Sequence, residues 1–99
     1  MQWMITQDLI NTPPNRRLSL TREMIAQFRA ASKEERVLLR VEIAKTMTHE
    51  FQLLDDDGEL YYVGLCTEED FAPLDWASAD VGATTMMTRK IGDTKWEHL

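Results

Sequence analysis

Lysine and arginine are absent from the stretch between Thr46 and Thr88, which holds ten of the 17 acidic residues in this 99-residue chain. The net charge of −6 is therefore unevenly distributed, because residues 1–49 carry +3 and residues 50–99 carry −9. Phosphate backbones and anionic membranes repel an acidic surface, whereas basic surfaces attract it. The charge predicts no direct binding to nucleic acids or membranes and favours a protein partner with a basic surface.

Cysteine and long hydrophobic runs are also scarce. The single cysteine, Cys66, excludes an internal disulfide and a cysteine-based zinc site. Polar residues interrupt the apolar segment 1–10, which has no charged leader, so it predicts neither a signal peptide nor a membrane span. The proportions of hydrophobic residues, 43%, and charged residues, 28%, are typical of a globular protein. We expect one domain spanning residues 1–99 in the reducing cytoplasm.

The N-terminal half predicts a strand, a loop and a helical region. Residues 2–6 are apolar and aromatic enough for a short strand. A Pro-Pro pair in residues 11–17 predicts a loop, because proline lacks the backbone N–H that pairing requires. Ser19 or Thr21 can cap a helix that begins the helical region 19–47.

A capping-box pattern divides this helical region in two. Ser32 is followed three residues later by Glu35, the spacing at which each side chain can bond to the other residue's backbone N–H. Two helices are therefore favoured, and one kinked helix is the alternative. The second helix has an apolar stripe that we expect to face the core, formed by Val37, Leu38, Val41, Ala44 and Met47.

The most specific local signal is a β-hairpin around the Asp-Gly pair at 57–58. A two-residue loop there pairs Leu53 with Tyr62, and it pairs Phe51 with Gly64. This face is the more apolar one, so we expect it to be buried against the helices. A three-residue loop with the glycine in a bulge is the competing register.

The C-terminal third predicts a long connection followed by two strands. Residues 66–83 are expected to be a loop with at most isolated helical turns, and residues 84–90 and 94–99 are expected to be strands around a turn. The fold class that results is α+β. It has a small, mostly antiparallel sheet of about five short strands, with two helices in 19–47 inserted after the first strand and packed on one face.

The hairpin FQLLDDDGELYYVG, followed by FAPLD at 71–75 and a terminal Trp-x-x-Leu, resembles a set of small uncharacterised bacterial and phage proteins. These share an F-x-L-x-D-D-D-G-x-x-Y-Y-x-G hairpin and an N-terminal x-W-x-I-T strand. The resemblance covers that strand and roughly residues 50–99, and it leaves 19–47 as an insertion or variable part. It implies a fold and no known activity, so it assigns no catalytic or binding residue.

Few side chains suit chemistry, and the sequence predicts no cofactor and no enzyme. The DDDG run fails the calcium-loop pattern at both ends, so we interpret it as a turn. Cys66 and a carboxylate pair are the alternatives for a small enzyme, and an acidic setting disfavours a thiolate at Cys66. The basic residues Arg29, Lys33, Arg36 and Arg40 are interpreted as a solvated surface with ion pairs.

The connection 66–83 is the favoured functional surface, because long irregular loops are often functional. Aromatic anchors among acids suit a basic partner, and the alternative is that the aromatics pin this loop to the core. The candidate partner-binding residues are Glu68, Glu69, Asp70, Phe71, Asp75, Trp76 and Asp80. The function predicted is a non-enzymatic protein-binding module, and a variant of this prediction is an inhibitor that contacts the basic surface of a nucleic-acid-binding partner. A homodimeric structural or regulatory protein, paired through a sheet edge or the helices, is the alternative.

Overall fold

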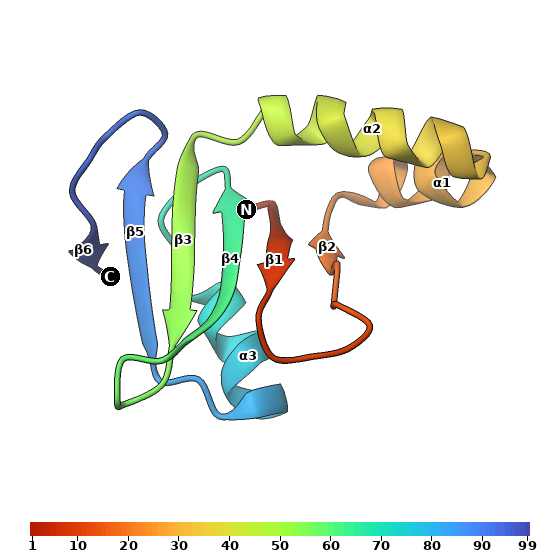
Figure 1. The fold of residues 1–99 in the computed structure, drawn as a ribbon. Helices are drawn as coiled ribbons and strands as arrows, with labels where there is room; N and C mark the ends of the chain where they lie inside the picture. Colours follow the sequence, from red (N-terminus) through yellow and green to blue (C-terminus); the bar gives the residue numbers. More distant parts are fainter.

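A six-stranded antiparallel sheet with the strand order β2-β1-β4-β3-β5-β6 organises the chain (Figure 1). The computed structural model describes residues 1–99. The strands are β1 (Trp3–Asp8), β2 (Leu18–Ser19), β3 (His49–Leu54), β4 (Leu60–Cys66), β5 (Thr85–Lys90) and β6 (Glu97–His98), and the helices are α1 (Arg22–Ala30), α2 (Lys33–Lys45) and α3 (Ala72–Val81). The α+β class and the antiparallel sheet are confirmed.

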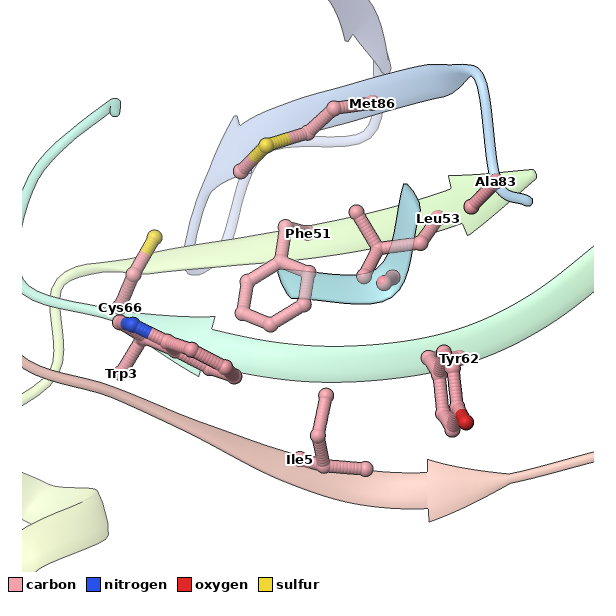
Figure 2. Packing of buried hydrophobic residues seen from close by; sticks show 9 residues of the cluster. Trp3, Ile5, Phe51, Leu53, Tyr62, Cys66, Ala83 and Met86 are labelled. Atoms are coloured by element: carbon pink, nitrogen blue, oxygen red, sulfur yellow. The ribbon is translucent and has the colours of Figure 1, made fainter. Parts of the chain in front are cut away.

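Helix α3 covers one face of the sheet, and the main core lies between them (Figure 1). Figure 2 shows the side chains of this core, which come from β1, β3, β4, β5, α3 and the segment after α3. The fully buried members include Ile5, Phe51 and Tyr62. Strand residues alternate between the two faces of a sheet, which explains why the apolar face predicted for the hairpin is the buried one.

Gly64 allows the ring of Phe51 to lie flat across strand β4. The two residues are cross-strand partners, as predicted. A Cβ atom at Gly64 would overlap both the Phe51 ring and the carbonyl oxygen of Met4 on strand β1. A residue without a side chain is therefore required at the centre of the sheet.

The β3–β4 turn combines the two registers that the sequence allowed. Leu53 pairs with Tyr62 as in the two-residue loop, but the register shifts at the next residue and Leu54 pairs with Leu60. At the tip, Gly58 has a φ of +81° and its N–H donates to the Asp55 carbonyl oxygen. This is the glycine bulge of the competing register, confined to the end of the hairpin.

The predicted connection 66–83 is wrong in its central part, because it contains helix α3. Pro73 lies in the first turn, where its missing N–H costs no hydrogen bond, and Gly82 ends the helix with a φ of +76°. Pro73 and Ala77 are buried against the sheet. Both end signals were present in the sequence, and the small alanine residues let the helix approach the strands closely.

Helices α1 and α2 begin at the predicted caps, but α2 ends at Lys45, before the predicted Met47, and neither helix covers the core face. Thr21 caps α1, and Ser32 with Glu35 forms the capping box of α2. Figure 1 shows the pair running beyond the β2 edge of the sheet. No residue of α1 is buried, and only Ile43 of α2 is. The expectation that the two helices in 19–47 pack on one face of the sheet therefore holds only in part. They pack against Met4 and Leu65, and α3 covers the apolar face of the hairpin.

Both helices contact the sheet through a small second core, α2 with Ile43 and α1 with the half-buried Met24 and Phe28. Ile43 and Met47 form this core with Met4, which points to the opposite side of β1 from Trp3 and Ile5. The Arg40 guanidinium donates to the carbonyl oxygen of Ile5 at 2.8 Å. We call the α1–α2 pair (residues 21–45) the helical hairpin; apart from these contacts it lies beyond the edge of the sheet.

The strand count also differs from the five expected. Strand β2 lies in the segment predicted to lead into the first helix, and its two residues pair with Trp3 and Met4. Strand β6 occupies only two of the residues in the expected strand 94–99. No helix is both long enough and apolar enough to cross a membrane.

Candidate protein-binding surface at the start of helix α3

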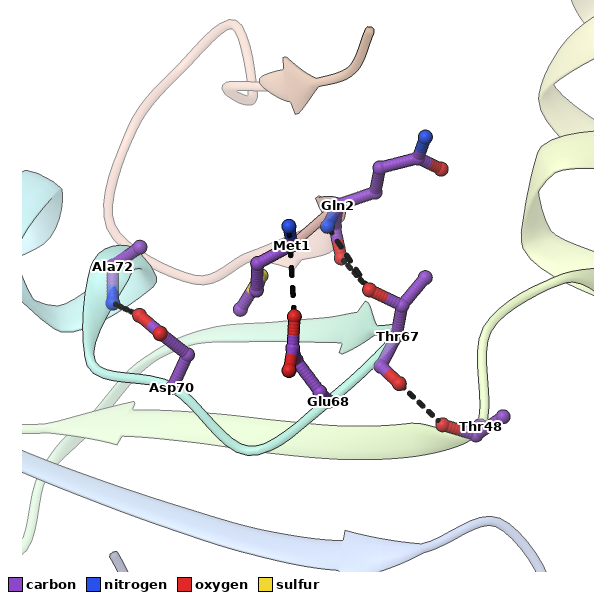
Figure 3. Close-up of polar contacts among 7 residues, drawn as sticks. All are labelled: Met1, Gln2, Thr48, Thr67, Glu68, Asp70 and Ala72. Atoms are coloured by element: carbon purple, nitrogen blue, oxygen red, sulfur yellow. Dashed lines mark hydrogen bonds and ion pairs between the residues drawn. The ribbon is translucent and has the colours of Figure 1, made fainter.

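The corner between β4 and α3 is held by hydrogen bonds to two other segments, as Figure 3 shows. The Thr67 N–H donates to the Gln2 carbonyl oxygen at 2.9 Å, and the Thr67 hydroxyl accepts from the Gln2 N–H at 3.0 Å. The Thr48 hydroxyl donates to the Thr67 carbonyl oxygen at 2.9 Å. These bonds fix the position from which the acidic segment 68–70 starts.

Asp70 has a structural role in this corner. Its Oδ1 accepts from the N–H of Ala72 at 2.8 Å, which satisfies one of the free N–H groups at the start of α3 (Figure 3). Negative charge is also favourable at the positive end of a helix. Asp70 therefore positions the helix, and its carboxylate is less available to a partner than those of its neighbours.

Phe71 is the exposed aromatic residue of this surface. It is 48% exposed at the N-terminal end of α3, and Asp75 follows one helical turn later on the same side. Asp75 is exposed and has no ion-pair or side-chain hydrogen-bond partner within the chain. The ring and the carboxylate thus present an apolar and an acidic group side by side to solvent.

Glu68 and Glu69 extend the acidic character of the surface. Glu68 lies 3.5 Å from the amino group of Met1, and its side chain remains largely exposed (Figure 3). Glu69 lies 3.8 Å from Nε2 of His49, whose Nδ1 shares a 2.7 Å hydrogen bond with the Thr48 hydroxyl. Neither carboxylate has a lysine or arginine partner.

Trp76 belongs mainly to the core, so the two aromatic residues of the predicted surface have different environments. Its ring lies 5.1 Å from that of Tyr62 and 5.6 Å from that of Trp3. The Arg17 guanidinium lies above the Trp76 ring at 5.6 Å, a cation–π contact that covers its outer side. The alternative interpretation, in which the aromatic residues attach this segment to the core, is therefore correct for Trp76. It does not apply to Phe71, which is on the surface.

Asp80 is separated from the rest of the predicted surface. At about 3.6 residues per turn it lies about 140° round α3 from Asp75. It is near Tyr62, and burial together with the charges of Asp8 and Asp80 raises the pKa of that phenol, although a hydrogen bond from Asn11 opposes the shift. The candidate surface is thus Glu68, Glu69, Phe71 and Asp75. Phe71 and Asp75 share one side of α3, and Glu68 and Glu69 precede them at the corner, near Met1 and His49.

Asp8 organises the loop after β1, a role that no sequence pattern indicated. Its carboxylate accepts from the backbone N–H groups of Ile10, Asn11 and Asn15, at 2.9, 3.0 and 2.7 Å. Partial burial raises the pKa of this carboxyl, but the hydrogen bonds outweigh that effect and hold it below its ordinary value of 3.8. The Asn11 amide also donates to the Tyr62 hydroxyl, which ties the loop to the core.

The alternatives for catalysis find little support in the geometry. Cys66 is fully buried, and this burial together with the charges of Glu69, Asp70 and Glu68 raises its thiol pKa to about 11, although a backbone hydrogen bond opposes the shift. A nucleophilic thiol requires the opposite, a lowered pKa and access to solvent.

The acidic turn of the hairpin is engaged in its own hydrogen bonds. Asp55 accepts from the backbone N–H groups of Asp57 and Glu59, at 2.9 and 2.8 Å, and from the Tyr61 hydroxyl at 3.3 Å. No group of three or more acidic, histidine or cysteine side chains has an arrangement suited to a metal ion. The turn interpretation accounts for the residues of the DDDG run.

The basic residues of the helical region hold the backbone together. Arg36 donates to the Phe28 carbonyl oxygen at 2.9 Å, and Arg40 donates to the carbonyl oxygens of Ile5 and Arg16. Burial, with a smaller contribution from the charge of Arg16, lowers the pKa of Arg40. The guanidinium groups of Arg36 and Arg40 thus bind backbone carbonyl oxygens, whereas the sequence led us to expect ion pairs with acidic side chains.

Comparison of the chain with protein-family models, curated proteins and solved structures finds no match in any of the three. The resemblance to hairpin-containing bacterial and phage proteins therefore stays a prediction, and the function rests on the geometry alone.

Proposed function

We propose that this chain is a non-enzymatic protein-binding module whose contact surface is the start of α3, formed by Glu68, Glu69, Phe71 and Asp75. The partner has a basic surface with an apolar pocket for the Phe71 ring. A finer form of the proposal is an inhibitor whose carboxylates take the place of phosphates in the nucleic-acid groove of its target. The homodimer alternative is taken up in the next subsection.

The observation that carries the proposal is the exposure of Phe71 beside carboxylates that have no lysine or arginine partner. Large aromatic residues are normally buried, as Trp76 is for the most part, and aromatic side chains dominate the binding energy of protein interfaces. The exposed carboxylates next to Phe71 in the chain supply complementary charge and faster association with a basic partner. The hydrogen bonds of Thr67 and Asp70 hold this surface in place before binding, which limits the entropy lost on association.

The enzyme alternative is disfavoured by the state of Cys66. Thiol labelling of the native protein at neutral pH is expected to be slow and to become complete only after denaturation, because the thiol is buried and its pKa is raised to about 11. Rapid labelling of the folded protein would reopen a catalytic role for this residue.

The proposal is tested by affinity capture from cell lysate with the immobilised chain and its Phe71→Ala and Asp75→Asn variants. We expect basic proteins to be retained at low salt, to be released as salt rises, and to be lost in the Phe71→Ala variant. Asp80→Asn is the matched control, because it removes the same charge from another side of α3 and is expected to retain the same proteins. Equal capture by all four proteins, or capture that is insensitive to salt, would contradict the proposal.

A further inference from the structure

Helix α2 is apolar on two opposite sides. Its inner side includes Leu39 and the buried Ile43, which packs against Met4 and Met47. Its outer side presents Val37, Leu38 and Val41, which are 61%, 66% and 50% exposed. We call these three residues the outer stripe. A helix that is apolar on opposite sides is normally covered on both, and contiguous exposed apolar groups of this kind mark interaction sites.

The outer stripe ends in opposite charges that are placed symmetrically. Glu34 and Lys45 are eleven residues apart, about three helical turns, so they lie on the same side of α2 as the stripe. Both are exposed. The midpoint between Glu34 and Lys45 is also the midpoint between Leu38 and Val41. When two copies of α2 lie antiparallel, the acid of each helix therefore faces the base of the other, and the apolar residues face each other.

We propose that α2 pairs antiparallel with α2 of a second copy of this chain, forming a two-fold symmetric homodimer. In this register Leu38 packs against the partner's Val41, and Glu34 faces the partner's Lys45 at each end. Two-fold interfaces require such a self-complementary patch, because each subunit offers the same surface to the other. The two helical hairpins then form a four-helix arrangement, whose loops and sheets lie outside the contact.

A groove between α1 and α2 adjoins the outer stripe and enlarges the apolar contact. It has a volume of about 470 Å³. Its apolar lining is Leu38 and Leu39 of α2 with Ala30 and Ala31 at the end of α1, and Gln27, Glu35 and Glu42 line its polar rim. The small alanine side chains leave room for residues of the partner's helices. Leu38 belongs to both the groove and the stripe, so one continuous apolar surface is available for burial.

Charge favours this surface over the rest of the molecule for self-association. Residues 19–47 hold six basic and four acidic side chains, whereas residues 50–99 have a net charge of −9. Two copies meeting through the acidic half would repel each other, and the helical hairpin avoids this cost. The strands at the two sheet edges, β2 and β6, are only two residues long, which limits pairing through an edge.

The proposal is tested by sedimentation equilibrium of the full chain over a range of concentrations. We expect a monomer–dimer equilibrium in the unmodified protein. The Leu38→Glu variant is expected to weaken dimerisation about tenfold or more, because it places a charge at the centre of the apolar contact. Leu38 is exposed in the monomer, so this substitution leaves the fold intact, and circular dichroism of the dilute protein verifies that.

Charge reversal tests the register. Glu34→Lys alone and Lys45→Glu alone each place like charges opposite one another twice per dimer, and each is expected to weaken dimerisation roughly three- to tenfold. The double variant has the net charge of the original chain and is expected to restore dimerisation. Lys33→Glu changes the net charge as Lys45→Glu does. Lys33 lies about 100° round α2 from Glu34, so this variant is expected to weaken dimerisation less than Lys45→Glu.

Three outcomes would overturn the proposal. The first is a monomer at every concentration up to about 1 mM. The second is a dimer that Leu38→Glu does not weaken. The third is a double charge reversal that does not restore what the single reversals lose. Phe71→Ala is expected to leave the dimer unchanged, so the proposal can fail or succeed independently of partner binding at α3.

Discussion

The sheet with α3 and the helical hairpin 21–45 are both well formed locally, but only the first has its own core. Nine buried residues form the cluster under α3, whereas α1 has no buried residue and α2 has one. Each helix has residues that satisfy its ends. Side chains cap the N-termini of α1 and α2, and Asp70 and Gly82 serve α3. Local signals determine where helices form, and burial determines how stable they are.

The comparison predicts where substitutions have large and small effects. Residues of the sheet and α3 should control the free energy of unfolding of the whole chain. Residues on the outer side of the helical hairpin should affect association and leave the stability of the monomer nearly unchanged.

The largest effect is expected for Gly64→Ala. The added methyl group overlaps the Phe51 ring and the Met4 carbonyl oxygen, so either the ring or strand β1 must move. We expect the free energy of unfolding to fall by about 3 kcal/mol, as measured by urea unfolding with circular dichroism. In the double variant with Phe51→Ala the two costs should be less than additive, because the clashing ring is absent. If the two losses are fully additive, the close contact between Gly64 and the Phe51 ring has no energetic importance.

Trp76→Ala and Phe71→Ala form a matched pair in and around α3. The Trp76 ring packs on Trp3 and Tyr62, so its removal should cost about 2–3 kcal/mol in the free energy of unfolding. The Phe71 ring is exposed, so its removal should change stability by at most about 0.5 kcal/mol while it abolishes partner capture. Similar losses of stability in the two variants would contradict the assignment of Phe71 to a binding surface.

Asp8→Asn is expected to have an intermediate effect. Replacement of the carboxylate weakens the hydrogen bonds that order residues 10–15, with a loss of about 1–2 kcal/mol at neutral pH. Because the folded-state pKa of Asp8 lies below 3.8, its contribution is fully present above that value. The contribution is lost as the pH falls through the lowered pKa. The difference in stability between the two proteins should therefore shrink between pH 5 and pH 2, and a constant difference would contradict this account.

The smallest effect on the monomer is expected for Val41→Ser on the outer side of α2. In dilute protein, where dimers are absent, the free energy of unfolding should change by at most about 0.5 kcal/mol. Ile43→Ala on the inner side of the same helix is the matched comparison and should cost about 2 kcal/mol, because Ile43 is buried against Met4. Equal effects would show that the outer side of α2 is covered within the monomer.

Much of the fold follows from local sequence signals. The Ser32–Glu35 capping box, the Thr21 cap and the pairing of Phe51 with Gly64 were predictable, because each depends on residues close together or on a short turn. Helix α3 also had signals at both ends, Pro73 and Gly82, but its interior lacks an amphipathic repeat. Alanine and small polar residues on α3 made the segment resemble a loop.

The sequence could not show which helix covers the sheet. The stripe of Val37, Leu38 and Val41 has the periodicity of a core-facing helix, and nothing local distinguishes an intramolecular core from an interface between subunits. For the candidate surface, too, local sequence did not distinguish a core residue from a surface residue. Phe71 and Trp76 occur in similar acidic contexts, and only the tertiary structure places Trp76 against Trp3 and leaves Phe71 exposed.

The contrast between the two parts of the molecule is tested most directly by amide hydrogen exchange at several protein concentrations. We predict that the amides of β3 and β4 are equally protected at every concentration, because their stability comes from the core under α3. The amides of α2 should gain protection as concentration rises, because pairing with a second copy stabilises the helical hairpin. Protection of α2 that equals that of β3 in dilute protein, and does not change with concentration, would contradict this account.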